Sequence, residues 1–197
     1  ASPVDSATVP IELLNGNPSM INYLDATNAW QLVRELKNAL GLPAAASFKH
    51  CSPAGAAVAV ELTDDLERAY EVVGKKLTPV RARGADPKSS FGDFVALSDI
   101  VDVETANFLK GVVSDGVIAP GYAPEALSIL SSKKGGGFIV MRGDADFTPP
   151  ARETRQVFGM QLTQDRNNRE VTLDDIATPE CGEFTDAARR DMVLGLI

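Results

Sequence analysis

Hydrophobic residues recur along residues 1–145 in two alternating patterns, short apolar runs and longer stretches with helical spacing. The clearest helical stretch follows Asp25, a residue type that often caps a helix start, and its apolar side chains fall on one face as far as Leu40. Gly41 and Pro43 then predict the end of this helix. Trp30 lies beside the apolar stripe, so we expect it to pack in the core rather than to contact a cofactor.

The other apolar runs predict an alternation of strands and helices. We expect strands from Ile11 to Asn15 and over Ala44–Phe48, Phe94–Leu97, Val117–Ala119 and Phe138–Met141, and helices over Thr63–Lys76, from about Glu104, and over Pro124–Lys133. Later residues are less regular, with a strand over Phe158–Thr163 and a helix over Asp186–Leu196. The alternation predicts a layered α/β domain over residues 11–197 with a parallel or mixed sheet, and residues 1–10 predict an extended lead-in.

Composition and charge narrow the function classes. With 44% hydrophobic and 23% charged residues the 197-residue chain has the composition of a globular domain, and its net charge of -8 argues against a broad nucleic-acid or anionic-membrane surface. The best candidate for a smaller, local basic patch is the group Arg81, Arg83 and Lys88. No apolar run reaches the roughly 20 residues of a membrane span, the start lacks signal-peptide features, and Cys51 and Cys181 show no disulfide or metal spacing. We therefore expect a cytoplasmic protein.

The first candidate for chemistry is the pair Lys49 and His50, at the end of the predicted strand Ala44–Phe48. Open α/β sheets place their sites at the carboxyl ends of strands, and histidine is the side-chain type that exchanges protons near neutral pH. His50 is the only histidine in the chain. The small residues S-P-A-G-A-A that follow the pair offer backbone N–H groups that no large side chain shields. The alternative is a structural histidine bonded to backbone beside a solvated lysine.

Three further stretches carry weaker signals. R-A-R-G-A-D-P-K-S-S-F-G-D-F-V-A-L at Arg81–Leu97 either stacks a flat ring on its phenylalanine or forms a surface turn, and it matches neither a phosphate-binding loop nor a dinucleotide fingerprint. Asp115, in S-D-G-V-I-A-P-G-Y, either binds a ribose hydroxyl or caps a turn. Q-D-R-N-N-R at Gln164–Arg169 either binds phosphate or forms a solvated loop, and the loop is the simpler interpretation.

Taken in order, these motifs resemble a known family. The transformylase domain of the bifunctional purine-biosynthesis enzyme has segments similar to S-F-K-H-C-S-P-A-G-A-A-V, A-R-G-A-D-P-K-S-S-F-G-D-F-V-A-L-S-D and V-S-D-G-V-I-A-P-G-Y. That enzyme joins aminoimidazole carboxamide ribonucleotide (AICAR) formyltransferase to inosine monophosphate (IMP) cyclohydrolase. N-A-W-Q-L-V-R-E-L and Q-D-R-N-N-R also match. The resemblance covers nearly the whole chain and the first half of the family's transformylase region.

The resemblance implies a fold, a reaction and site residues. The fold would be a three-layer α/β/α arrangement with a mixed sheet, similar to cytidine deaminase but without zinc, because His50 is followed by Cys51, Ser52 and Pro53 and no H-x-E with P-C-x-x-C is present. The reaction would be formyl transfer from 10-formyltetrahydrofolate to the 5-amino group of the AICAR nucleotide, with Lys49 and His50 catalytic. The remaining implied binding residues, which would line the folate and nucleotide pockets, are Lys88, Ser90, Phe91, Gly92 and Asp115.

Departures from the family pattern leave alternatives open. Several residues that usually precede A-R-G-A-D are missing near Val80, and Lys88 stands where relatives often carry methionine. Family sites are built across a homodimer and use segments outside these 197 residues, so we expect the chain alone to form one wall of each site and to turn over negligibly. The alternatives to this partial formyltransferase are a non-catalytic nucleotide-binding module and a structural half that serves dimerisation.

Overall fold

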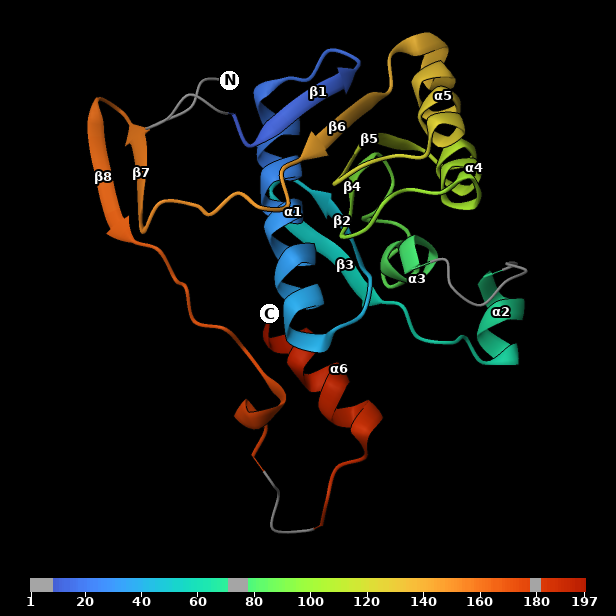
Figure 1. The fold of residues 1–197 in the computed structure, drawn as a ribbon, viewed down its shortest axis with the longest axis vertical. Coiled ribbons are helices and arrows are strands. Elements are labelled where there is room, and N and C mark those ends of the chain that lie inside the picture. Colours follow the sequence, from blue (N-terminus) through green and yellow to red (C-terminus); the bar gives the residue numbers. More distant parts are fainter. Residues whose placement is uncertain (1–8, 71–77, 178–181) are drawn as a thin grey trace.

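A six-stranded mixed sheet forms the centre of the molecule (Figure 1). The computed structural model describes residues 9–70, 78–177 and 182–197. The strand order is β1-β6-β5-β4-β2-β3, and the strands span β1 Ile11–Asn15, β2 Ala44–Lys49, β3 Ser52–Val58, β4 Asp93–Leu97, β5 Ser114–Ala119 and β6 Ile139–Gly143. β4, β5 and β6 are mutually parallel, whereas β2 runs antiparallel to both β4 and β3, and β1 runs antiparallel to β6.

Helices cover both faces of the sheet. α1 (Met20–Leu40) packs on one face, and α3 (Thr78–Gly84), α4 (Val103–Gly111) and α5 (Pro124–Ser132) supply the buried residues of the other. Because successive strand residues point to opposite faces, Phe94 and Ala96 of β4 belong to the α1 side and Val95 and Leu97 to the other. This arrangement confirms the three-layer α/β/α fold.

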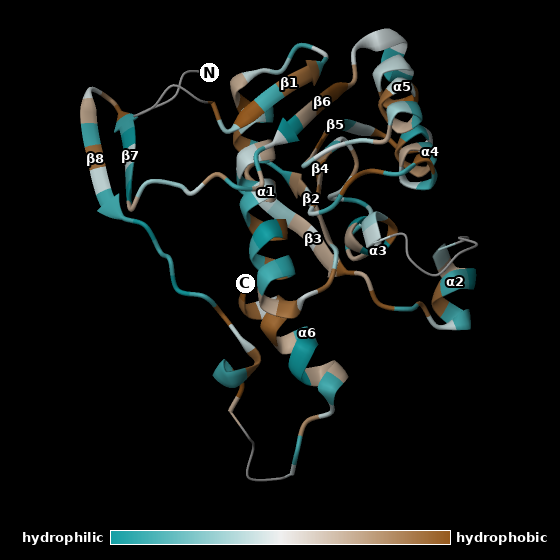
Figure 2. Ribbon diagram, in the orientation of Figure 1, coloured by the Kyte–Doolittle hydropathy of each residue, from teal (hydrophilic) through white to brown (hydrophobic). Residues whose placement is uncertain are grey.

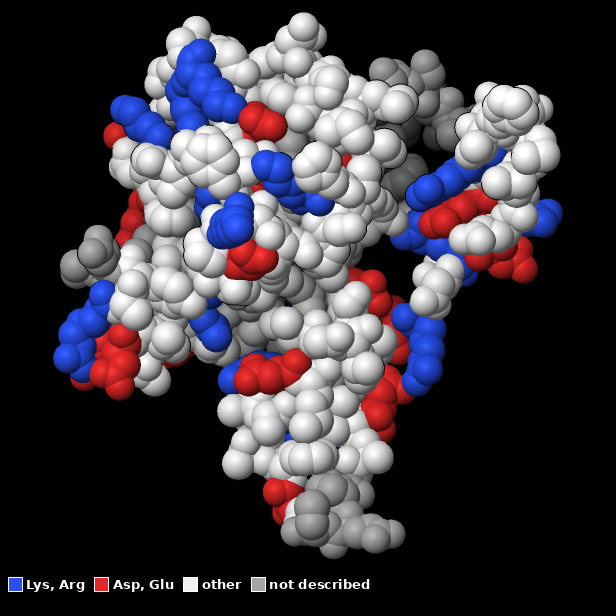
Figure 3. Space-filling model, turned by 180° about the vertical axis from the view of Figure 1, so that it is seen from behind, with Lys and Arg blue, Asp and Glu red and all other residues white. Residues whose placement is uncertain are grey.

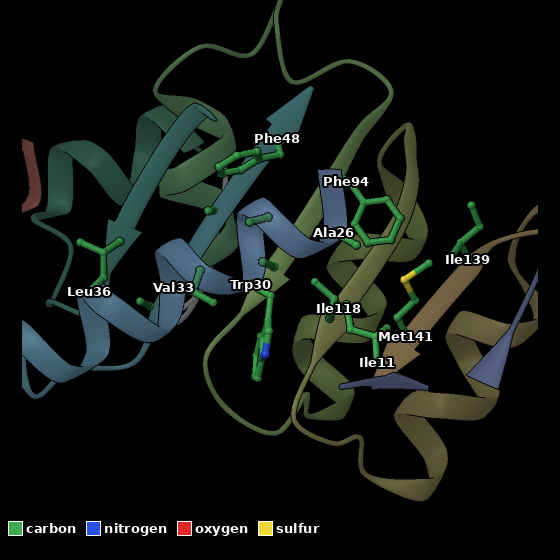
Figure 4. Packing of buried hydrophobic residues seen from close by; sticks show 14 of the residues in the cluster. Ile11, Ala26, Trp30, Val33, Leu36, Phe48, Phe94, Ile118, Ile139 and Met141 are labelled. Carbon is green, nitrogen blue, oxygen red and sulfur yellow. The ribbon is translucent and has the colours of Figure 1, made fainter. Parts of the chain in front are cut away.

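The larger core lies between α1 and the sheet. In Figure 4, Trp30, Val33 and Leu36 of α1 lie over the sheet that carries Phe48 and Phe94. Trp30 is only 5% exposed, which confirms that it is a packing residue. Strands buried on both faces are continuous apolar runs rather than alternating ones, which is why Ala44–Phe48 was recognisable in the sequence.

The start of α1 differs from the prediction. The helix begins at Met20 with Ser19 as its cap, because the Ser19 side chain accepts from the Asn22 backbone N–H while Asn22 Oδ1 accepts from the Ser19 N–H. This reciprocal pair is a capping box with asparagine in the place where glutamate or glutamine is usual. The N-cap prediction at Asp25 was therefore wrong, and Asp25 lies buried inside the helix. The predicted end at Gly41 is confirmed by its left-handed C-cap conformation.

Several shorter elements complete the chain. α2 spans Asp64–Tyr70, and the rest of the predicted helix to Lys76 lies outside the described residues, as do residues 1–8 of the lead-in. The predicted strand Phe158–Thr163 corresponds to β8 (Met160–Asp165), which begins two residues later and pairs with β7 (Arg152–Val157) in a hairpin whose turn holds Phe158 and Gly159 at positive φ. The remaining elements are α6 (Asp186–Leu196), as predicted, and two short 3-10 helices, η1 (Lys133–Gly136) and η2 (Leu173–Asp175).

Hydropathy follows this architecture. In Figure 2 the teal of hydrophilic residues dominates β7, while brown is concentrated in the central strands. Within the described part of the chain, none of the helices combines the length and the apolar character that a bilayer span requires.

Candidate active site

The candidate residues lie together at one end of the central strands, where β4 and β5 begin; this end is called the site edge of the sheet. Because β2 runs antiparallel to β4, with Phe48 opposite Phe94, the end of β2 at Lys49 lies beside the start of β4. Phe94 in turn pairs with Gly116 of β5, the residue after Asp115. We expected a site at the carboxyl ends of strands. The pair does follow the carboxyl end of β2, but it lies at the amino ends of the parallel strands, since β2 is reversed.

His50 lies in a tight turn between β2 and β3. Lys49 and Ser52 are the last paired residues of the hairpin, and the two residues between them, His50 and Cys51, have φ values of 55° and 64°. Two central residues with positive φ define a type I′ turn, which usually carries asparagine and glycine. For residues with a side chain each left-handed conformation costs roughly 1–2 kcal/mol. The turn therefore projects the exposed His50 from a backbone that needs support.

Asp25 of α1 supplies part of this support. Its carboxylate Oδ1 accepts a hydrogen bond of 2.6 Å from the Cys51 backbone N–H, and the residue is 6% exposed. Sequence analysis missed this contact. The available signal was the position of Asp25, an acidic residue on the apolar stripe that continues with Ala29 and Val33.

The small residues after the turn form β3 and support a helix. Ser47 pairs with Gly55, and a methyl group on Gly55 would lie 2.2 Å from the backbone oxygen of Ala82 in α3. The glycine is therefore explained by the close approach of α3 to the sheet. Part of the small-residue segment that follows the pair is therefore required by packing against α3.

Lys49 is held against the loop before β4. Its Nζ donates a hydrogen bond to the backbone carbonyl of Phe91. Gly92 has φ +76°, and a Cβ atom there would lie 3.2 Å from Lys49 Nζ. The Phe91 side chain is 62% exposed, so its ring is available for stacking. Two motifs that are far apart in the sequence thus form one surface of ammonium, backbone and aromatic ring.

A buried ion pair anchors this loop from below. Asp93 is fully buried and pairs with Arg83, and Ser47 Oγ lies 2.6 Å from Asp93 Oδ2 and 2.8 Å from Ser90 Oγ. Burial raises the pKa of the Asp93 carboxyl, while the Arg83 charge and the Ser47 hydrogen bond oppose that shift. Ser114 Oγ donates to the Asp93 carbonyl and ties β5 to β4. Ser90 therefore lies under the loop, with its hydroxyl already engaged.

The two arginines of the candidate basic patch are engaged within the chain. Arg83 is held by Asp93, and Arg81 donates to the Val58 carbonyl in a partly buried position. Lys88 is exposed in the loop. On the face drawn in Figure 3, basic and acidic side chains lie next to each other rather than in one broad basic field.

Asp115 and its neighbours form the far side of the candidate site. Asp115 is half exposed, and Lys134 Nζ lies 2.9 Å from its Oδ1. The adjacent Lys133 points inward, where its Nζ donates to the carbonyls of Leu109 and Val112 at the end of α4 and lies 4.3 Å from the centre of the Phe138 ring. Burial, helped by the charges of Lys134 and Arg83, lowers the pKa of Lys133 to about 8.

The Gln164–Arg169 segment lies away from this edge. It borders a hollow of about 330 Å³ against the second half of α1. Arg166 donates to Gln31 and Glu153, and Arg169 pairs with Asp175. Both arginines are therefore engaged by this chain's own side chains, as expected of a structural loop. Among the described residues, no group of three or more His, Cys, Asp or Glu is arranged to hold a metal ion.

Comparison with known proteins identifies the family. A family model described as the AICARFT/IMPCHase bienzyme matches residues 2–197. The bifunctional purine biosynthesis protein PurH of two Staphylococcus epidermidis strains is 31% identical over 177 residues, which is 90% of this chain and 32% of that protein. PurH of Roseobacter denitrificans is 34% identical over 153 residues, 78% of this chain and 26% of that protein. The chain spans about a third or less of these relatives, and it belongs to the AICARFT/IMPCHase bienzyme family.

Proposed function

We propose that this chain is the amino-terminal part of a transformylase region and that Lys49 and His50 act in formyl transfer from 10-formyltetrahydrofolate to the 5-amino group of AICAR. The observation that supports this most directly is the contact of Lys49 with the Phe91–Gly92 backbone, with Asp115 at the same sheet edge. Three motifs that resemble the family, separate in sequence, meet there.

The chemistry requires proton removal and charge stabilisation. The aromatic amine of the nucleotide is a weak nucleophile, and it must lose a proton as its nitrogen bonds to the formyl carbon. His50, exposed on its turn, accepts that proton when neutral. The Lys49 ammonium stabilises the negative charge that develops on the formyl oxygen. When the bond from the formyl carbon to the folate nitrogen breaks, a proton passes to that nitrogen, and formylated nucleotide and tetrahydrofolate are released.

Substrate positions follow from the two sides of the site. The exposed ring of Phe91 is suited to stacking on the flat pterin or on the imidazole of the nucleotide. The Asp115 carboxylate accepts hydrogen bonds from nucleotide hydroxyls. β4 separates β2 from β5, so Lys49 and Asp115 are about 10 Å apart across two strand spacings, which is room for a nucleotide.

The proposal also covers how the site is completed by other parts of the protein and where the protein acts. His50 and Phe91 are both exposed, so this chain offers one open wall, and a second copy in a homodimer together with further segments would close it. We assign the protein to the cytoplasm, where folate and nucleotide are both available. Residues 11–197 would form the amino-terminal subdomain of the transformylase region.

The test uses the protein expressed from its complete reading frame. His50→Gln is expected to lower kcat by about 10²–10⁴-fold and Lys49→Met by about 10²–10³-fold, each measured as formyl transfer to AICAR. Lys110→Met, at the exposed end of α4, is the control and should leave turnover unchanged. Unchanged kcat in both His50→Gln and Lys49→Met would refute the catalytic assignment. Titration with AICAR would then separate a binding module from a structural half.

A further inference from the structure

Asp25 is a buried carboxylate that the proposed chemistry does not use. It lies in the second turn of α1, on the face that packs against the sheet, and is 6% exposed. A buried charge is unfavourable unless hydrogen bonds compensate for the lost water. Its Oδ1 accepts a hydrogen bond from the Cys51 N–H at 2.6 Å, a short and therefore strong charge-assisted bond.

The hydrogen bond is made in the turn, where pairing between β2 and β3 has ended. Lys49 and Ser52 form the closing pair, so the N–H groups of the two central residues, His50 and Cys51, are not used by pairing between β2 and β3. Both central residues have positive φ, and Cys51 occupies the position where type I′ turns favour glycine. Without support from outside, a cysteine there would favour a different backbone conformation.

The placement of His50 depends on this backbone. His50 precedes Cys51 directly, and its side chain is exposed, so packing does not fix its direction. Rotation of the turn would move the imidazole while leaving β2, β3 and the sheet intact. We propose that Asp25 is a positioning residue for formyl transfer, whose bond to the Cys51 N–H holds the type I′ turn and thereby the His50 imidazole in place.

The inference rests on the proposed function of His50, but it makes a separate claim about α1. Asp25 and Cys51 are 26 residues apart in sequence, and the Cys51 N–H donates to a buried carboxylate of the helix. A purely structural role would affect the free energy of unfolding. A positioning role also affects kcat, because a displacement of about 1 Å at a reacting group can cost about 10²-fold in rate.

The experiment first removes the hydrogen bond to Asp25 and then replaces Cys51 by glycine, which adopts the turn conformation without that support. In the protein from its complete reading frame, Asp25→Ala is expected to lower kcat by about tenfold or more, with KM for AICAR and folate within about twofold. Adding Cys51→Gly to Asp25→Ala is expected to restore most of kcat, because glycine adopts positive φ without a side-chain penalty. Cys51→Gly alone should retain the parent kcat.

A matched control separates positioning from loss of stability. Val33→Ala removes two buried methyl groups from the same face of α1, two turns further along, without touching the turn. It should lower the free energy of unfolding and leave kcat unchanged. If Asp25→Ala does not yield folded protein, Asp25→Leu, which fills a similar volume without an acceptor, gives the same comparison with and without Cys51→Gly.

The outcomes are distinct. A loss of kcat on substitution of Asp25 that Cys51→Gly reverses supports the proposal. An unchanged kcat, or a loss that the glycine leaves in place, overturns it. His50→Gln measured in parallel tests the function itself: full activity there refutes the catalytic assignment, whereas an inactive His50→Gln with a fully active Asp25→Ala refutes only the role of Asp25.

Discussion

Lys49 and Phe91, 42 residues apart in sequence, are joined by a hydrogen bond from the lysine Nζ to the phenylalanine carbonyl. The next residue, Gly92, has φ +76°, and its missing Cβ leaves the space that the ammonium occupies. The position of the proposed oxyanion-stabilising group therefore depends on a glycine in another motif.

Gly92→Ala is predicted to displace Lys49. The new methyl group would lie 3.2 Å from Nζ, and the flexible lysine side chain would move before the backbone does. We expect formyl transfer to fall by about tenfold or more, with a loss of about 1 kcal/mol in the free energy of unfolding from the positive φ.

Gly41→Ala is the matched control for this prediction. Gly41 has φ +65° at the end of α1, and a Cβ atom there meets nothing within 4 Å. It should lose similar stability, measured by urea denaturation, and keep its kcat. Equal activity in the two variants would contradict the proposed dependence of Lys49 on Gly92.

Arg83→Met is predicted to destabilise the fold strongly. Asp93 is fully buried, and removal of its partner would leave a carboxylate uncompensated, which costs about 3–5 kcal/mol. Arg68→Met breaks the exposed Arg68–Asp65 pair and should cost about 0.5 kcal/mol or less. Denaturation curves of both variants provide the measurement, and similar losses would show that the Asp93 pair is not a structural anchor.

The buried Lys133 predicts a rise in stability at alkaline pH. Its pKa is lowered from 10.5 to about 8, so between these values the unfolded chain binds more protons than the folded chain, and the free energy of unfolding rises with pH. Below about pH 8 the Lys133 amine is protonated in both the folded and the unfolded chain, so the folded protein carries the full cost of a buried charge and its free energy of unfolding is lowest. The difference in unfolding free energy between the parent and Lys133→Met should therefore increase from pH 8 to 10. Lys110→Met, an exposed lysine on α4, should show no such trend.

Asp115→Asn is predicted to weaken nucleotide binding. The substitution removes the charge that pairs with Lys134 and that we propose to accept hydrogen bonds from nucleotide hydroxyls. We expect the Kd for AICAR to rise by about tenfold, since a hydrogen bond to a charged group contributes about 1.5–3 kcal/mol. Asp65→Asn, on exposed α2, is the control for calorimetry. An unchanged Kd would remove Asp115 from the site.

Local patterns predicted the elements that local sequence determines. The run Ala44–Phe48 is apolar throughout because both faces of β2 are covered, and Gly41 ends α1 because its left-handed conformation suits glycine. β3 and α3 were not predicted. β3 consists of small residues with proline and glycine, which have weak strand propensity, and it forms because the turn at His50 folds it back on β2. α3 has only seven residues, too few for a helical period to show.

The candidate site depended on information that periodicity does not carry. Motif resemblance indicated Lys49, His50 and Asp115, but only the strand order β5-β4-β2 places them at one edge. The supporting residues were harder to find. Asp25 looked like a helix cap because aspartate is a common cap. Asp93 directly precedes the predicted strand Phe94–Leu97, and nothing in the sequence indicated that it would be buried with Arg83 and Ser47 as partners.

Because β2 runs opposite to β4, β5 and β6, its carboxyl end with Lys49 lies at the amino ends of those strands. The connections of the sheet therefore fall into two sets, those on the side of the proposed site and those on the opposite side. The segment that enters β4 carries Phe91 and Gly92, and the start of β5 carries Asp115, so the connections into these two strands are constrained by the spacing of the proposed site. Segments that leave β4, β5 and β6 emerge at the opposite edge, and the β7–β8 hairpin already extends the chain after β6. Peptide tags or reporter domains are therefore expected to be tolerated at the exposed turn of this hairpin, at Phe158 and Gly159, without altering the distance between Lys49 and Asp115.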